Sequence, residues 1–160
     1  FDGSTPVVGD KYMVTVDPGN KQLLAVGNGI LLGSNAKVFA DHGIDVNNIK
    51  YGDLLDISVV NAVRDDIISN TKSQVLDILD ANNITLNDCQ IDALTSRMYN
   101  TGNINRFVEM YNRYGDTQEL YDNWMQYPVY GQNGEYFSTL ADRRQKEWNL
   151  FHNSIYPDEQ

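Results

Sequence analysis

The feature that most constrains the fold is a change of hydrophobic period near residue 36. Before it, residues 11–16 (KYMVTV) and 22–30 (QLLAVGNGI) have strand composition, and residues 17–20 (DPGN) between them favour a turn. This pattern predicts a β-hairpin followed by a glycine-rich bend. After residue 36 the apolar residues recur at helical spacing. We therefore predict an α+β fold, with a small hairpin lobe over 1–35 and a larger, mostly helical lobe over 36–160.

Capping residues and glycines set the expected helix boundaries. Ser58 can cap a helix that runs to about Asn82, and Thr85 can cap the next helix, which Gly102 ends. That second helix has apolar residues almost all round, so it is expected to be the central and most buried one. Shorter helices are expected over 104–114, 117–126 and 139–152, with a loop over 127–137.

Length and charge exclude several classes of partner. The chain has 160 residues, enough for one domain with a buried core. It carries 12 Lys and Arg against 22 Asp and Glu, a net charge of −10. Without a Lys/Arg cluster it lacks the basic patch of a nucleic-acid binder, and an anionic membrane surface would repel it. No apolar run approaches the roughly 18 residues of a membrane span. We expect neither nucleic acid nor membrane as a partner.

Cysteine and histidine usage argues against a metal site. Cys89 is the one cysteine, so the chain can form neither an internal disulfide nor a cysteine-based zinc site. The two histidines, His42 and His152, lie far apart and have no ligand-like spacing. We therefore expect no metal and no other cofactor.

Two helical segments carry a family resemblance. Residues 90–94 (QIDAL), followed by 99–102 (YNTG), resemble the Q-x-D-A-L … Y-N-x-G helix of phage-type lysozymes, glycoside hydrolase family 24. Residues 140–148 (LADRRQKEW) resemble the closing L-x-x-R-R-x-x-E helix of that family, although Thr139 stands where a glycine is usual. The resemblance implies a lysozyme-like fold. The charged residues of the second motif, Arg143, Arg144 and Glu147, are expected to form structural hydrogen bonds or ion pairs on a packed helix.

Weaker motifs near the start occur in the order that this family has. Phe1-Asp2-Gly3 resembles the F-E-G segment that carries the catalytic acid, and Asp17 falls at the strand turn of the second carboxylate. Residues 26–29 (VGNG) resemble I-G-Y-G. The resemblance therefore implies Asp2 and Asp17 as catalytic residues. The candidate substrate-binding residues are Asn28, Asp92 and Asn100.

Cleavage of a glycosidic bond requires two carboxyl groups in different states. One, protonated, supplies the leaving oxygen with a proton, and the other directs water or stabilises the positive ring. In an inverting enzyme the two groups lie about 6.5–9.5 Å apart. The resemblance implies inverting cleavage between N-acetylmuramic acid and N-acetylglucosamine in peptidoglycan, with Asp2 and Asp17 facing one cleft. Asp10, in a Gly-Asp turn, is the alternative acid.

Three positions depart from the family pattern. No Glu precedes Glu109, so Asp2, one methylene shorter, replaces the family's Glu. Ala25 stands where the family has a water-positioning Thr, and Ile30 where a His often follows the bend. Two interpretations stay open: a muramidase with an altered site, or a catalytically impaired lysozyme fold with a glycan-binding or structural role. An unrelated helical interaction domain is a third.

The resemblance also implies a setting. The expected partner is bacterial peptidoglycan, cut at the start of infection or during host lysis, in the virion or at the host wall and periplasm. A net charge of −10 does not assist binding to anionic walls. Wall targeting is therefore expected to belong to other domains or subunits, as in a phage tail or a multi-domain endolysin. Because the chain begins with Phe1 and not Met, we expect this single domain, 1–160, to be excised from a longer protein.

Overall fold

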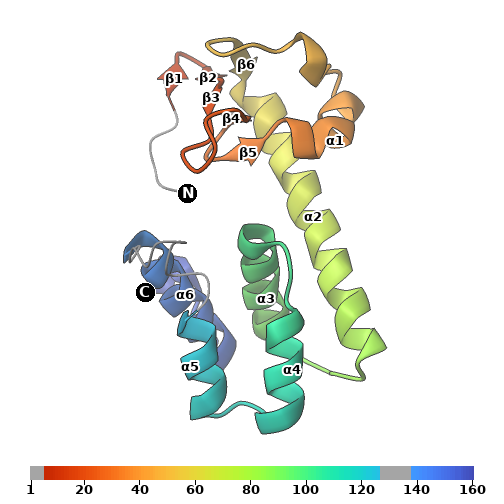
Figure 1. Ribbon diagram of the computed structural model, residues 1–160, viewed down its shortest axis with the longest axis vertical. Coiled ribbons are helices and arrows are strands. Elements are labelled where there is room, and N and C mark those ends of the chain that lie inside the picture. The colour runs from red at the N-terminus through yellow and green to blue at the C-terminus, as the bar shows by residue number, and fades with distance from the viewer. Residues whose placement is uncertain (1–5, 127–137) are drawn as a thin grey trace. The chain divides into compact units, whose positions relative to one another are not determined.

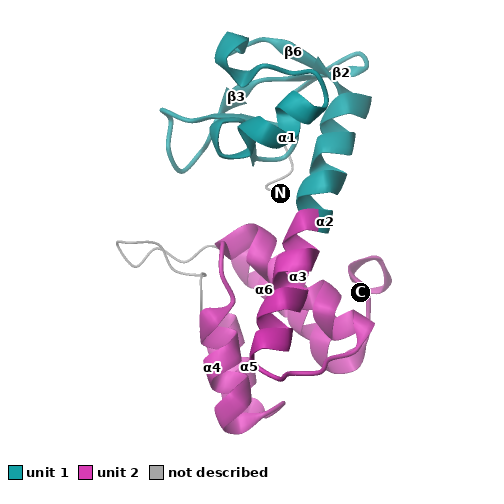
Figure 2. Ribbon diagram, turned by 90° about the vertical axis from the view of Figure 1, so that its right-hand side faces the viewer, with its two compact units in different colours: residues 1–69 teal, residues 70–160 magenta. Residues whose placement is uncertain are grey.

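Six β-strands and six α-helices make up the part of the chain that the structure, a computed structural model, describes: residues 6–126 and 138–160 (Figure 1). The chain divides into two compact units, Phe1–Ser69 and Asn70–Gln160 (Figure 2). The boundary falls inside one continuous helix, α2 (Ile57–Ala81), which contributes residues to both units. Short antiparallel sheets followed by helices confirm the predicted α+β class.

Two small antiparallel sheets form the first part of unit 1. One has the strand order β1-β2-β6, with β1 at Val7–Val8, β2 at Lys11–Met13 and β6 at Leu54–Asp56. The other has the order β3-β4-β5, with β3 at Thr15–Val16, β4 at Leu24–Val26 and β5 at Ile30–Leu31. The predicted hairpin is the β3–β4 pair, and the turn at residues 17–20 connects it.

The predicted strand over 11–16 is divided at Val14 between the two sheets. The N–H of Val14 donates to the Asp53 carbonyl at 2.8 Å, and the Val14 carbonyl accepts the N–H of Gly52 at 2.8 Å. The Val14 side chain is fully buried. The loop before β6 therefore forms both backbone hydrogen bonds of Val14. At this residue the chain passes from the β1-β2-β6 sheet to the β3-β4-β5 sheet. This partner lies far along the sequence, so strand composition alone did not indicate the division.

The core of unit 1 draws on residues well beyond the hairpin. Phe39 from α1 (Ala36–Asp41), Leu55 from β6 and Val60 from α2 pack in one cluster with the apolar faces of the strands. The short 3-10 helices Gly33–Asn35 and Val46–Asn48 connect these elements. Because these later residues complete the core, the compact unit extends to Ser69, further than the lobe boundary after residue 35 that the sequence suggested.

Unit 2 contains the predicted helices. They are α3 (Asp88–Thr101), α4 (Asn105–Tyr114), α5 (Gln118–Gln126) and α6 (Ser138–Asn153), followed by a 3-10 turn at Pro157–Glu159. The loop predicted over 127–137 lies outside the described residues. One boundary is corrected: Asn87, not Thr85, caps α3. The Asn87 side chain accepts the N–H of Gln90 at 2.9 Å, while the Gln90 side chain accepts the N–H of Asn87 at 2.9 Å.

The core of unit 2 is aromatic and is organised around α3 and α6. Rings from α4, α5 and α6 pack edge to face, tilted or stacked, with centroids 5.2–6.5 Å apart. They belong to Phe107, Tyr111, Tyr121, Trp124, Trp148 and Phe151. No residue of α3 from Cys89 to Thr101 is exposed, and Ala93 and Leu94 are fully buried. The helix is buried in unit 2 as predicted, although α6 contributes more buried residues, five against four. Gly102 ends it in the left-handed conformation, with φ of 87°.

Candidate active site

Asp17 directly follows β3, and the turn orients its carboxylate. Its Oδ2 accepts the N–H of Gly19 at 3.0 Å and that of Asn20 at 2.8 Å. The N–H of Asp17 itself donates to the Leu23 carbonyl at 2.8 Å, so the strand pairing continues into the turn. Among the residues that the structure describes, none donates a hydrogen bond to the other oxygen, Oδ1. The turn therefore holds the carboxylate by one oxygen and leaves the second available to a water.

The glycine-rich bend between β4 and β5 is built from three successive left-handed residues. Gly27, Asn28 and Gly29 have φ of 58°, 63° and 93°. An added Cβ at Gly27 would lie 2.6 Å from Cγ1 of Val60, so only glycine fits against α2 there. From the same helix, Nη2 of Arg64 donates to the Gly27 carbonyl at 2.5 Å. This contact anchors the bend, and Asn28 at its tip is exposed.

Asp17 and Asn28 therefore lie at opposite ends of one short strand. The turn that holds Asp17 leads into β4, and the bend that holds Asn28 leaves it. A three-residue strand rises about 10 Å. Unit 1 thus carries both predicted residues, one at each end of the central strand of the β3-β4-β5 sheet.

Asp92 and Asn100 lie in unit 2, where both side chains have partners. Oδ2 of Asp92 accepts the hydroxyl of Tyr156 at 2.9 Å, and Nζ of Lys72 lies 3.5 Å from its Oδ1. The hydrogen bond to Asp92, and a weaker one to Cys89, raise the pKa of the Tyr156 phenol. Oδ1 of Asn100 accepts Nη2 of Arg144 at 2.7 Å. These contacts tie the C-terminal tail and α6 to α3.

The charged residues of the α6 motif form a buried ion-pair group. Arg144 is fully buried and Glu147 is 4% exposed, with Nε of Arg144 3.0 Å from Oε1 of Glu147. The other carboxylate oxygen accepts the hydroxyl of Ser96, from α3, at 2.6 Å. Burial lowers the pKa of the Arg144 guanidinium, and the charge of Glu147 opposes that effect. The expected structural role of this motif is confirmed, since its contacts join α3 to α6.

The other predicted acids are Asp2 and its alternative, Asp10. Asp2, with its neighbours Phe1 and Gly3, lies outside the described residues. The alternative acid, Asp10, is exposed in the turn between β1 and β2, and its backbone carbonyl accepts the N–H of Ile57 at 3.0 Å.

One residue of the hairpin, Thr15, was not among the site residues predicted from the sequence. Thr15 lies directly opposite Ala25 in the β3–β4 pair, and it is half-buried. Ala25 itself is 3% exposed. The signal that could have identified Thr15 is its spacing of two residues from Asp17, which places both side chains on one face of a strand.

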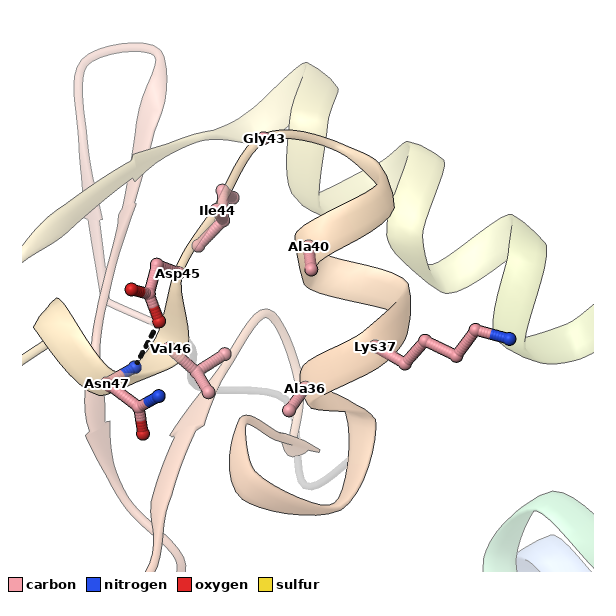
Figure 3. A pocket seen from close by; sticks show the side chains of 8 residues that line it. All are labelled: Ala36, Lys37, Ala40, Gly43, Ile44, Asp45, Val46 and Asn47. Carbon is pink, nitrogen blue, oxygen red and sulfur yellow. Dashed lines mark hydrogen bonds between the residues drawn. The ribbon is translucent and has the colours of Figure 1, made fainter.

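Two cavities of the described surface lie away from the predicted site residues. One of about 470 Å³ opens beside α1, between Lys37 and Val46 (Figure 3). Its carboxylate, Asp45, caps a 3-10 turn by accepting the N–H of Asn47 at 3.0 Å. A second, of about 280 Å³, lies in unit 2 beside Asp116 and His152, which are hydrogen-bonded at 2.9 Å. None of the predicted site residues lines either cavity.

The described residues were also compared with the requirements of a metal site and of a membrane-spanning helix. Among them, no group of three or more His, Cys, Asp or Glu side chains is placed to hold a metal ion. None of their helices combines the length and the hydropathy that crossing a bilayer requires.

Comparison with known proteins identifies the family. A family model described as phage lysozyme matches residues 17–147, which is most of the chain. No curated protein and no solved structure shows a significant match. The match begins at Asp17, directly after β3, and includes β4, the bend at 27–29 and the R-R-x-x-E motif of α6. Phage lysozymes are peptidoglycan hydrolases that act on the cell wall. The chain belongs to the phage lysozyme family, and its α+β fold is lysozyme-like, as the resemblance to glycoside hydrolase family 24 predicted.

Proposed function

We propose that this protein is a muramidase that cleaves the bond between N-acetylmuramic acid and N-acetylglucosamine in peptidoglycan, with inversion. The observation that carries the proposal is the Asp17 carboxylate, which the turn holds at the first residue of the family match. An inverting hydrolase needs a carboxylate that takes a proton from the attacking water. Oδ1 of Asp17, to which no described residue donates a hydrogen bond, suits that role.

The reaction then requires a general acid, and we assign it to Asp2. Asp2 in its protonated form donates to the glycosidic oxygen as that bond breaks. Water adds to the anomeric carbon from the opposite face, and Asp17 takes its proton, so that both carboxyl groups exchange protonation states. Asp2 is one methylene shorter than the family's Glu, which draws its proton back by about 1–1.5 Å. A misplacement of about 1 Å can slow a reaction about 100-fold.

Exchange of the acid tests this assignment. We expect Asp2→Glu to raise hydrolysis by about 10- to 1,000-fold, because general acid catalysis is worth about 10²–10⁴-fold. Asp2→Asn should abolish the remaining activity. The measurement is release of reducing ends from purified Gram-positive and Gram-negative sacculi near pH 6, at equal folded concentration by circular dichroism.

Asp10→Asn is the matched control, because Asp10 is also an aspartate near the chain start and is exposed in a turn. It should leave the rate within about twofold of the parent. A loss at Asp10 equal to that of Asp2→Asn would transfer the role of acid to Asp10.

A second function has one specific observation in its favour. Ala25, at 3% exposure, offers no hydroxyl where the family positions a water. The loss of this hydroxyl is what we expect of a catalytically impaired lysozyme fold that binds glycan or serves a structural role. If Asp2→Glu stays as inactive as the parent on every wall, while the protein still sediments with insoluble peptidoglycan, this second function is the better account.

We also place the protein in a larger assembly. A net charge of −10 opposes approach to an anionic wall. A phage tail or a multi-domain endolysin would supply wall targeting through other domains or subunits, with residues 1–160 as its single lysozyme domain. The site of action would then be the virion at the start of infection, or the host wall and periplasm during lysis.

A further inference from the structure

The β3–β4 pair brings a hydroxyl to the place where the family position lacks one. Thr15 and Ala25 are direct partners in the antiparallel register. The side chains of direct partners project from the same face, with Cβ atoms about 4.5–5.5 Å apart. The hydroxyl of Thr15 therefore lies one strand away from the methyl of Ala25, on the same face of the sheet.

Asp17 belongs to that face as well. The hydrogen bond from its N–H to the Leu23 carbonyl, 2.8 Å long, continues the register of Thr15 with Ala25. Alternate residues of a strand share a face and are separated by about 6.6 Å. That distance separates their Cα atoms; one water can bridge two side-chain oxygens that lie up to about 5.6 Å apart, since each of its hydrogen bonds is about 2.8 Å long.

The opposite face of this sheet is the core of unit 1. Val26, Ile30 and the partly buried Leu24 pack there in one hydrophobic cluster. Thr15 and Ala25 are not in that cluster. The face that carries Thr15 and Asp17 is thus the one that points away from this cluster.

The Thr15 hydroxyl is available for a water. In the described part of the chain no residue forms a hydrogen bond with this side chain. A hydroxyl both donates and accepts, so it can hold a water without changing its own protonation state.

We propose that Thr15 positions the attacking water: its hydroxyl holds the water from β3, across the strand pair from Ala25, while Asp17 takes the proton. The water loses one proton to Asp17 and forms its bond to the anomeric carbon, and Thr15 gains and loses no proton. This inference rests on the proposed hydrolase function. Thr15 is a positioning residue, because the proton goes to Asp17.

Removal of the hydroxyl at constant shape is the first test. Thr15→Val keeps a β-branched strand residue, so we expect the fold to persist. The kcat for release of reducing ends from soluble peptidoglycan fragments should fall about 100-fold, with KM within twofold of the parent. Thr15→Ser, which retains the hydroxyl, should keep most of the kcat. Thr85→Val, at an exposed threonine, is the matched control and should change neither constant.

Transfer of the hydroxyl across the strands is the second test. Thr15→Ala combined with Ala25→Thr moves it from β3 to the position that the family uses. We expect at least about 10-fold recovery of kcat over Thr15→Ala alone. Circular dichroism and Tm of every variant separate a loss of fold from a loss of position. All variants are measured in the parent and in the Asp2→Glu background.

The outcomes distinguish the two proposals. If neither the parent nor Asp2→Glu releases reducing ends, the hydrolase function fails and the role of Thr15 fails with it. If the enzyme is active but folded Thr15→Val keeps its kcat within twofold, only the role of Thr15 is overturned. A rise in KM at constant kcat would also overturn it, because a residue that positions water acts on the chemical step.

Discussion

At the scale of the residue, Gly27 shows that the bend leaves no room for a side chain against α2. An alanine there would bring its Cβ to 2.6 Å from Cγ1 of Val60, at a φ of 58° that side chains disfavour. We expect Gly27→Ala to destabilise the fold by about 2–4 kcal/mol, from overpacking and backbone strain together. Urea unfolding measures this. Gly29→Ala has the strain but nothing within 4 Å, so it should cost about 1–2 kcal/mol. Equal losses would show that contact with α2 is not the cause.

At Asp17 one substitution can remove the catalytic role of the carboxylate while the hydrogen bonds of the turn persist. In Asp17→Asn the side-chain oxygen can still accept the N–H groups of Gly19 and Asn20, so the turn should persist. The ability to take a proton from water is lost. We expect the rate in the Asp2→Glu background to fall by about 10²–10⁴-fold, with Tm almost unchanged. Full activity in Asp17→Asn would remove Asp17 from the mechanism.

At the scale of the element, the link between α3 and α6 is an ion pair taken out of water. Removing one partner leaves the other charge buried and uncompensated. Glu147→Gln leaves the buried charge of Arg144 without its partner carboxylate. We therefore expect it to lower the free energy of unfolding by about 3–5 kcal/mol, as measured by denaturant unfolding.

The chain contains a matched exposed pair as the control for that change. Arg106 and Glu109, in α4, are 3.0 Å apart and each is 56% exposed. Glu109→Gln should change stability by less than about 1 kcal/mol. If Glu147→Gln were equally mild, the α6 motif would not be what joins the two helices.

At the scale of the whole molecule, charge governs the encounter with the wall. With a net charge of −10, the protein is repelled by walls that carry anionic polymers. Salt shortens the reach of that repulsion, from a Debye length of about 30 Å at 0.01 M to about 8 Å at 0.15 M. We expect hydrolysis of intact sacculi to speed up over this range. Sacculi stripped of their anionic polymers are the control, and their hydrolysis should respond little. Equal salt dependence on both would contradict the electrostatic account.

The sequence by itself determined the features that depend on near neighbours. The turn at 17–20, the helix end at Gly102 and the long helix from about Ser58 follow from Pro, Gly, capping residues and helical periodicity. These act within one or two turns of chain, so a local pattern predicts them. The motifs of α3 and α6 also indicated the family, because the short sequence motifs of a family can be recognised without the fold. Two local predictions were wrong: Ser58 is not a cap but the second residue of α2, which begins at Ile57, and Asn87 rather than Thr85 caps α3.

Only the tertiary structure decided which distant residues meet. The division of the predicted strand at Val14, the extension of unit 1 to Ser69 and the anchoring of the bend by Arg64 all depend on contacts far apart in sequence. The same holds for Thr15, whose place opposite Ala25 is a matter of strand register. Register is set by the turn and by the buried face of the sheet as a whole, and a shift of one residue would reverse every side chain. The composition of a single strand carries no such information about its partner.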